Sequence, residues 1–153
     1  MTYKPYDLII AEASSAASEG ATTVQLTNNT GTILNLLNPV TLDSAGDMKL
    51  INVSIEADAL STVGVLKETT LNTLKGKVVR IGKIENVNSL GFALRDAIYV
   101  SKTGGLTNTP PTTGVNGFVS GDFVIRLGKI AKNQTNTLQK DFLIEVTIIG
   151  QLA

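Results

Sequence analysis

The 153-residue sequence contains no cysteine, no histidine and no tryptophan. The absence of cysteine excludes disulfide bonds, thiolate catalysis and cysteine metal sites. The absence of histidine removes the commonest general base and a common zinc ligand. Aromatic residues make up only 5% of the chain, so the stacking platforms typical of sugar-binding clefts are also scarce. These absences argue against an enzyme and predict no cofactor.

The sequence also lacks an excess of charge of either sign. Thirteen Lys and Arg balance thirteen Asp and Glu, which leaves no basic field to attract nucleic acid. No apolar run approaches the roughly 18 residues that span a bilayer, and no basic segment followed by an apolar run opens the chain. We therefore expect a soluble protein that binds neither nucleic acid nor membrane.

Charged residues make up 17% of the chain, against roughly 25% in an average soluble domain. Thr, Asn, Ser and Gly are abundant instead. A neutral hydrogen-bonding surface costs less to desolvate than a charged one. This composition favours a protein that packs against copies of itself or against a large neighbour, with an ordinary monomer as the alternative.

The carboxylates offer the remaining candidates for chemistry. Glu56 and Asp58 would share one face of a strand, and Asp43 and Asp47 flank a turn, so either pair is a candidate for a hard cation. No spacing matches a calcium loop, however, and acidic residues in turns are normally solvated. Gly104–Gly105 lacks the sequence context of a phosphate-binding loop. We predict no catalytic residue and no metal site.

A seven-residue phrase occurs twice, at Val78–Ile84 and at Val124–Ile130, with only aliphatic exchanges between the copies. Each copy is rich in β-branched residues and carries a Gly two positions after its Arg, which is typical of a twisted or bulged strand. A polar loop follows each copy, and then an apolar run that an Asp opens, at 96–100 and 141–146. The sequence therefore predicts an internally duplicated, long-looped β-hairpin.

Equivalent positions of the repeat are expected to have equivalent roles. We expect Ile81 and Leu127 to lie in the core. Arg80 and Arg126 are equivalent too, and each either lies on a solvated strand face or pairs with a carboxylate across a subunit contact.

The rest of the chain reads as short β-elements joined by polar turns. Alternating apolar residues on either side of Asn28–Gly31 predict a hairpin over 22–37. Met48–Ile55 alternates as a half-buried strand, and 56–73 allows one short helix or turn. Residues 101–122 are rich in Gly, Pro, Thr and Asn with almost nothing to bury, which predicts a long surface loop and a contact surface.

Residues 1–20 carry little hydrophobic pattern and read as an arm, whereas 21–153 form a single β-domain with possible subregions 21–75 and 76–153. The arm is either a frayed terminus or a segment that a neighbouring molecule orders. In the second case, the predicted partner-binding residues of the arm are its anchoring tyrosines and the residues between them: Tyr3, Lys4, Pro5 and Tyr6.

The segment Asp96–Pro111, followed by Val124–Gly128, resembles a domain of small structural proteins of tailed bacteriophages. In these proteins, a strand ending in Tyr-x-Ser runs into a Gly-Gly-Leu-Thr loop, a Thr-Pro-Pro turn and a Val-x-Arg-x-Gly strand. The resemblance extends from Gly76 to the end of the chain and does not cover residues 1–50. One position departs from the pattern, because members of the family usually have Gly immediately before the Asp, where this chain has Arg95.

The resemblance implies an all-β domain of a virion protein, made in the cytoplasm of the bacterial host. Taken together with the composition and the patterns above, it predicts an all-β barrel or sandwich with an extended N-terminal arm and at most one short helix. The small size favours a homotrimeric decoration (cement) protein that binds the major capsid protein. In the long loop, the predicted partner-binding residues are Thr107, Asn108, Pro110 and Pro111. A head or tail fibre module that attaches to a receptor is the alternative. A free carbohydrate-binding protein is less favoured, and an enzyme less still.

Overall fold

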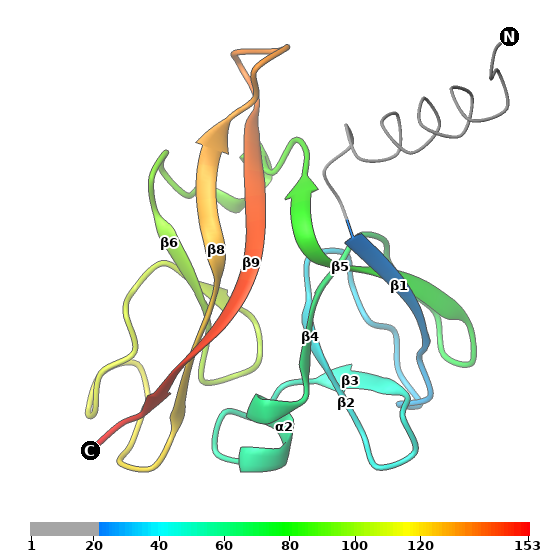
Figure 1. Cartoon of the computed structure of the whole chain (residues 1–153), viewed down its shortest axis with the longest axis vertical. Helices are drawn as coiled ribbons and strands as arrows, with labels where there is room; N and C mark the ends of the chain where they lie inside the picture. The colour runs from blue at the N-terminus through cyan, green and yellow to red at the C-terminus, as the bar shows by residue number, and fades with distance from the viewer. Residues whose placement is uncertain (1–21) are drawn as a thin grey trace, which may run out of the picture.

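The strands pair in one antiparallel sheet whose two ends stay open (Figure 1). The computed structural model describes residues 22–153. The sheet order is β3-β2-β4-β5-β9-β8-β6-β7, and β1 pairs with β5 outside this path. The strands are β1 (Thr22–Thr27), β2 (Pro39–Leu42), β3 (Met48–Leu50), β4 (Thr62–Leu66), β5 (Lys75–Ile84), β6 (Ala97–Val100), β7 (Leu106–Thr107), β8 (Phe123–Lys132) and β9 (Lys140–Gln151). The helical elements are α2 (Glu56–Leu60) and the 3-10 turn η1 (Asn88–Leu90). The prediction of an all-β fold is therefore confirmed.

The two copies of the repeated phrase form β5 and β8, which lie on either side of β9. They meet β9 in the same register: Gly82 and Gly128 both lie opposite Ile144, and the residues two positions further on both lie opposite Phe142. The two glycines also share a positive φ, 132° and 152°. The repeat is thus one strand conformation used twice against a common partner.

The predicted duplication of a whole hairpin is wrong for the first copy. The second copy does form a hairpin, because β8 pairs with β9. After β5, however, the chain crosses the end of that hairpin, where the Val87 amide donates to the Lys140 carbonyl and the Arg95 amide donates to the Ile130 carbonyl, each at 2.8 Å. As a result β6 pairs with β8 instead of β5. The polar loop after the first copy is long enough to pass β9 and β8 before β6 begins.

Two further strand predictions need correction. The predicted hairpin over 22–37 does not form, since β1 pairs with β5. The buried Asn28 side chain instead donates to the carbonyls of Thr32 and Thr70, at 2.7 and 2.8 Å, which ties its turn to a distant segment. The strand predicted over 48–55 ends at Leu50, because a turn follows in which the Ile55 amide donates to the Asn52 carbonyl. The short helix expected in 56–73 is present as α2.

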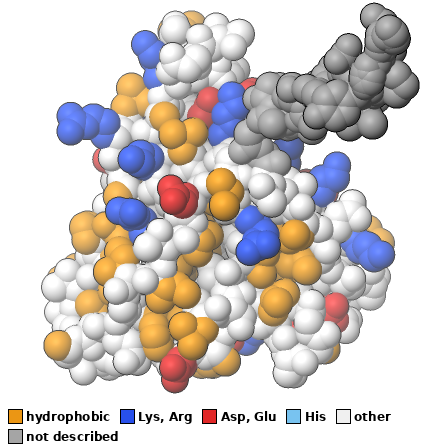
Figure 2. Space-filling model, in the orientation of Figure 1, with side chains coloured by type: hydrophobic (Ala, Val, Ile, Leu, Met, Phe, Trp, Pro, Cys, Tyr) orange, Lys and Arg blue, Asp and Glu red, His pale blue; other side chains and the backbone are white. Residues whose placement is uncertain are grey.

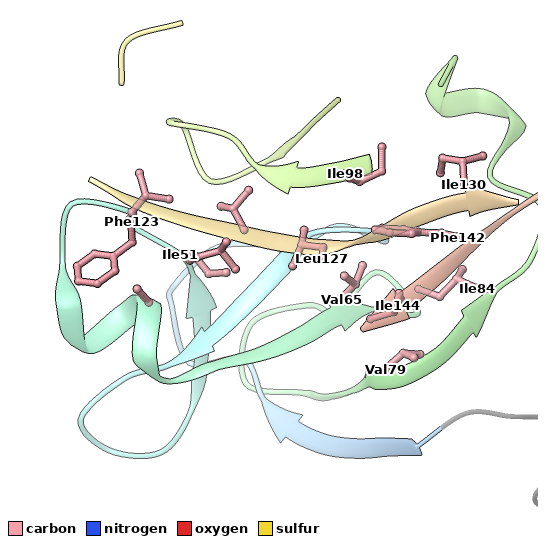
Figure 3. Close-up of a cluster of buried hydrophobic side chains, with 14 of the residues drawn as sticks. Ile51, Val65, Val79, Ile84, Ile98, Phe123, Leu127, Ile130, Phe142 and Ile144 are labelled. Carbon is pink, nitrogen blue, oxygen red and sulfur yellow. The ribbon is translucent and has the colours of Figure 1, made fainter. Parts of the chain in front are cut away.

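The main hydrophobic core lies between the two halves of the curled sheet and contains residues from both 21–75 and 76–153 (Figure 3). Ile51 and Val53, just after β3, belong to the same cluster as Ile98 and Val100 of β6. The repeat is not symmetric in burial, however. Leu127 is fully buried, whereas 59% of its equivalent, Ile81, is exposed. The expectation that both residues lie in the core is therefore wrong for Ile81, because β5 carries β1, β4 and β9 along its length and turns this residue outward.

The two ends of the open sheet meet through a turn and a loop, without strand pairing. The Phe123 amide at the start of β8 donates to the Val53 carbonyl at 2.8 Å. The backbones approach closely at Gly104 too, where an added Cβ would lie 3.0 Å from the Ile51 carbonyl oxygen. Residues 22–153 therefore form a curled, open sheet and not the closed barrel that was one of the two predicted architectures.

The long loop over 101–122 contributes to the core, contrary to the prediction that it has almost nothing to bury. Phe118 is only 2% exposed and joins the main cluster. The loop also contains β7, which pairs with β6. These contacts hold the loop against the sheet and position its polar residues.

Candidate interaction surface

The predicted partner-binding residues of the arm, Tyr3, Lys4, Pro5 and Tyr6, lie outside the described residues. Their proposed role therefore stays a prediction.

The four predicted contact residues of the long loop differ in accessibility. Asn108 and Pro110 are exposed, Thr107 is half-buried and Pro111 is buried. Asn108 is held within the chain, because its side-chain amide donates to Asp96 Oδ2 at 2.9 Å. The Pro111 side chain is packed inside the fold, so it does not offer a contact surface. Thr107, Asn108 and Pro110 remain predicted contacts.

The turn before β6 holds Asp96 in place and forces Arg95 into an unusual conformation. The hydrogen bond from Asn108, followed by the one from the Ala93 amide at 2.9 Å, keeps the pKa of the Asp96 carboxyl below its usual value. Arg95 has a φ of 77°, in the left-handed region that glycine occupies without steric cost. The pattern that this segment resembles usually has Gly here, a residue that suits a positive φ.

We expect the Arg95→Gly variant to be more stable than the wild-type chain by about 0.5 to 1 kcal/mol. Relief of the left-handed strain at this exposed residue outweighs the greater freedom of glycine in the unfolded chain. Urea unfolding at neutral pH measures the difference. Arg126→Gly is the control, since Arg126 is an exposed residue of β8 whose φ is not positive, and glycine there is expected to destabilise the chain. Equal destabilisation by both substitutions would show that Arg95 is not strained.

A buried ion pair ties the two ends of the sheet together. Lys102 Nζ lies 2.7 Å from Asp122 Oδ2, and Asp122 is only 1% exposed. Ser54 Oγ donates to the other carboxylate oxygen at 2.7 Å and accepts from Lys102 Nζ at 2.8 Å. Lys102 and Ser54 both donate hydrogen bonds to the Asp122 carboxylate. Lys102 therefore does not accept the proton of the Ser54 hydroxyl, as the base of a serine nucleophile would. We call these three residues the seam clamp.

The pKa of Asp122 reflects two opposed effects. Burial raises it, but the hydrogen bonds from Lys102, the Val119 amide and Ser54, together with the charge of Lys102, outweigh burial and hold the pKa below its usual value. A carboxyl whose pKa is lowered on folding stabilises the folded state at pH values above its unfolded pKa of about 3.9. That stabilisation is lost as the pH falls through the folded pKa.

We therefore expect Asp122→Asn to lower the free energy of unfolding by about 1 to 3 kcal/mol at pH 7, since Lys102 loses its buried partner. The difference from wild type should shrink as the pH falls below about 4, because the wild-type carboxyl then becomes neutral as well. Urea unfolding between pH 2.5 and 7 tests this. A difference that stays constant over the whole range would mean that the charge of Asp122 does not contribute to the clamp.

Apolar side chains form a continuous exposed surface where β4 and β9 diverge from β5. One hollow of about 340 Å³ lies over β1, β2 and β4, and a second of about 320 Å³ lies between β4, β5 and β9. The two hollows share Thr62, Val63 and Arg80. We define the apolar band as their apolar lining residues: Val24, Leu26, Leu42, Leu60, Val63, Ile81, Val146 and Ile148. Figure 2 shows orange side chains spread across the middle and lower part of one face, with blue and red side chains among them in the middle.

Several members of the apolar band are strongly exposed for their size. Leu60 is 60% exposed, Ile81 59% and Ile148 37%. Single exposed apolar residues are normal on a protein surface, but a contiguous group of them marks a contact site. The apolar band is therefore the candidate interaction surface of the described chain.

A third hollow, of about 440 Å³, adjoins the apolar band at Glu145 and has a different character. Its lining includes three cations, Arg95, Arg126 and Lys129, and one carboxylate, Glu145. We call it the basic hollow. Its other lining residues are Ala97, Gly128, Leu143 and Ile144.

The sequence patterns did not predict either surface. Ile81 lies in an apolar run that looks like a core strand, but the pairing of β5 with β9 ends at Ile81 and Glu145, which leaves the Ile81 side chain exposed. Arg126 was a candidate for a subunit contact because of its place in the repeat, and the structure adds Arg95 and Lys129 beside it. Their convergence depends on the pairing of β6 with β8, which the hairpin prediction did not include.

No protein-family model matches the chain, and no curated protein matches it. Within residues 22–153, no group of three or more Asp and Glu side chains is placed to hold a metal ion. In the same part of the chain, no helix has the length and apolar character needed to cross a membrane.

Proposed function

We propose that this chain is a structural protein of a tailed-bacteriophage particle that binds the outer surface of the capsid as a decoration protein and stabilises the shell. Its partner is the major capsid protein, and it acts as a homotrimer in the virion after synthesis in the bacterial cytoplasm. Neither nucleic acid nor membrane takes part. The observation that carries the proposal is the apolar band, a contiguous exposed surface on a chain poor in charge.

The apolar band has the properties that a cementing contact needs. A specific protein interface buries about 800 Å² on each partner, and each Å² of apolar surface removed from water contributes about 25 cal/mol before the costs of association. Leu60 and Ile81 stand out from the surface, and Val63 lies between the two hollows. Each bound subunit adds one weak contact to the capsid shell, and the contacts of many subunits add up. The stabilisation of the shell is therefore mechanical and additive.

The geometry of the segment that resembles phage proteins also supports the proposal. The residues of the motif form one local unit, in which β6 pairs with β7 on one side and β8 on the other. Arg95 keeps the left-handed conformation at the position where the family usually has Gly. The seam clamp then fixes the loop between β7 and β8 to the opposite end of the sheet, which suits a subunit that must stay folded under mechanical load.

Co-sedimentation with phage heads that lack this protein tests the proposal. We expect the wild-type chain to pellet with the heads at a fixed ratio to capsomers, and to do so as a trimer by light scattering. The Ile81→Asp variant should remain folded but stay in the supernatant, because it places a charge in the apolar band. The control is Leu138→Asp, an exposed position in the turn between β8 and β9, outside both the band and the long loop.

Three results would contradict the proposal in different ways. Wild-type chain that stays in the supernatant would exclude decoration, and binding to whole cells would then favour the fibre alternative. Full pelleting of Ile81→Asp would remove the apolar band from the contact. Loss of binding in Leu138→Asp alone would place the contact on the turn between β8 and β9.

A further inference from the structure

The basic hollow is lined by three cationic side chains that form no ion pair with a carboxylate of the described residues. Arg95, Arg126 and Lys129 all line it, with Glu145 as its one carboxylate. Within residues 22–153, no ion pair involves any of the three cations. A concave surface lined by one sign of charge concentrates its field and attracts the opposite charge. The hollow therefore has an excess of positive charge on a chain whose formal net charge is zero.

The backbone shapes this hollow from two directions. Lys129 lies opposite Leu143 in the pairing of β8 with β9, so the two side chains share a face. At the floor, Gly128 lets the strands approach so closely that an added Cβ would lie 1.8 Å from the Leu143 carbonyl oxygen. At the rim, Arg95 keeps its left-handed conformation despite the steric cost. Such strain in a rigid turn is most common where the side chain has a role in binding.

We propose that the basic hollow is a carboxylate-binding site that receives Asp or Glu side chains from an extended acidic segment of a partner protein. The planar guanidinium groups of Arg95 and Arg126 suit a carboxylate, which each can bind with two parallel hydrogen bonds. Lys129 adds a third positive charge. The inference rests on the proposed function only for the identity of the partner, which would be the capsid protein.

A protein segment fits the hollow better than an acidic sugar does. The lining contains no aromatic side chain for a sugar ring to stack on, but it does contain Ala97 and Leu143, and Leu143 is 39% exposed. The hollow also continues into the apolar band at Glu145. A segment that alternates acidic and apolar side chains would match both surfaces in charge and polarity.

Titration of the full-length chain, followed by the NMR signals of its backbone amides, tests the site. The probes are a blocked peptide, acetyl-Glu-Leu-Glu-Val-Asp-amide, its neutral counterpart acetyl-Gln-Leu-Gln-Val-Asn-amide, and trigalacturonate. We expect the acidic peptide to shift the signals of residues 95–97, 126–129 and 143–145. The binding should weaken about fivefold or more between 50 and 300 mM NaCl, because screening reduces the attraction.

A second pair of exposed cations supplies a matched control. The double variant Arg126→Gln/Lys129→Gln should bind the acidic peptide about tenfold more weakly. Lys75→Gln/Lys77→Gln also removes two positive charges, from β5 at positions that line none of the three hollows, and should leave the affinity unchanged. The dispersion of the NMR signals shows directly whether each variant is folded.

Several results would overturn the inference. Equal binding of the neutral peptide, or equal loss of affinity in both double variants, would show that the hollow does not select a carboxylate. Binding of trigalacturonate without the acidic peptide would make it a site for an acidic sugar. These titrations use the isolated protein. If they show no peptide binding while the chain still pellets normally with phage heads, the carboxylate site is excluded and the proposed function is unaffected.

Discussion

Replacing Leu127 with Asp is expected to unfold the domain, whereas the same replacement at Ile81 is expected to leave it folded. The two residues are equivalent in the repeat, but Leu127 is fully buried and Ile81 is 59% exposed. A carboxylate at position 127 would lie in the main hydrophobic cluster without a partner. Burying it there costs at least about 4 kcal/mol, which approaches the whole stability of a marginal domain, about 5 kcal/mol.

At position 81 the carboxylate would remain in contact with water. Ile81 lies opposite Glu145 in the pairing of β5 with β9, so the like charges should cost less than about 1 kcal/mol. Urea unfolding and far-UV circular dichroism of the two variants measure the difference. If Ile81→Asp is as destabilised as Leu127→Asp, then position 81 is covered, and the apolar band is not an exposed surface.

Replacing Gly128 with Ala should destabilise the domain by at least about 3 kcal/mol. Two effects combine at this position. Gly128 has a φ of 152°, and an added Cβ would lie 1.8 Å from the Leu143 carbonyl oxygen and 2.9 Å from its carbon. Relief of that overlap requires β8 and β9 to separate where both copies of the repeat contact β9.

Gly150 separates the two effects, because it has nearly the same φ, 151°, but an added Cβ there would meet no atom within 4 Å. Gly150→Ala should therefore show the backbone cost alone, and its difference from Gly128→Ala measures the steric contact. Thermal unfolding of both variants gives the comparison. Equal effects would mean that the spacing between β8 and β9 does not depend on the glycine.

Local sequence patterns predicted the elements of this fold more successfully than their partners. The repeat correctly marked β5 and β8 as strands, and its glycines as conformationally special. Pairing was harder to predict, because a strand pairs with whichever neighbour the tertiary fold supplies. The hairpins expected after β1 and after β5 both failed for this reason, since β1 pairs with β5 and β6 with β8.

The burial of single residues and the candidate surface also depend on how the strands pair and curl, which local sequence patterns do not give. Alternation marks Ile81 as apolar but does not say whether another layer covers it. Phe118 lies in a loop rich in Gly and Thr, and its burial follows only from the curl of the sheet. The seam clamp joins residues 54, 102 and 122, whose spacing carries no signal in the sequence.

Cryo-electron microscopy of phage heads incubated with the full-length chain tests the central claim most directly. We predict trimeric density on the outer surface of the shell at sites between capsomers, with β4, β5 and β9 turned toward the capsid protein. Heads with a bare outer surface, or with density only at single projecting fibres or on the tail, would contradict a decoration role.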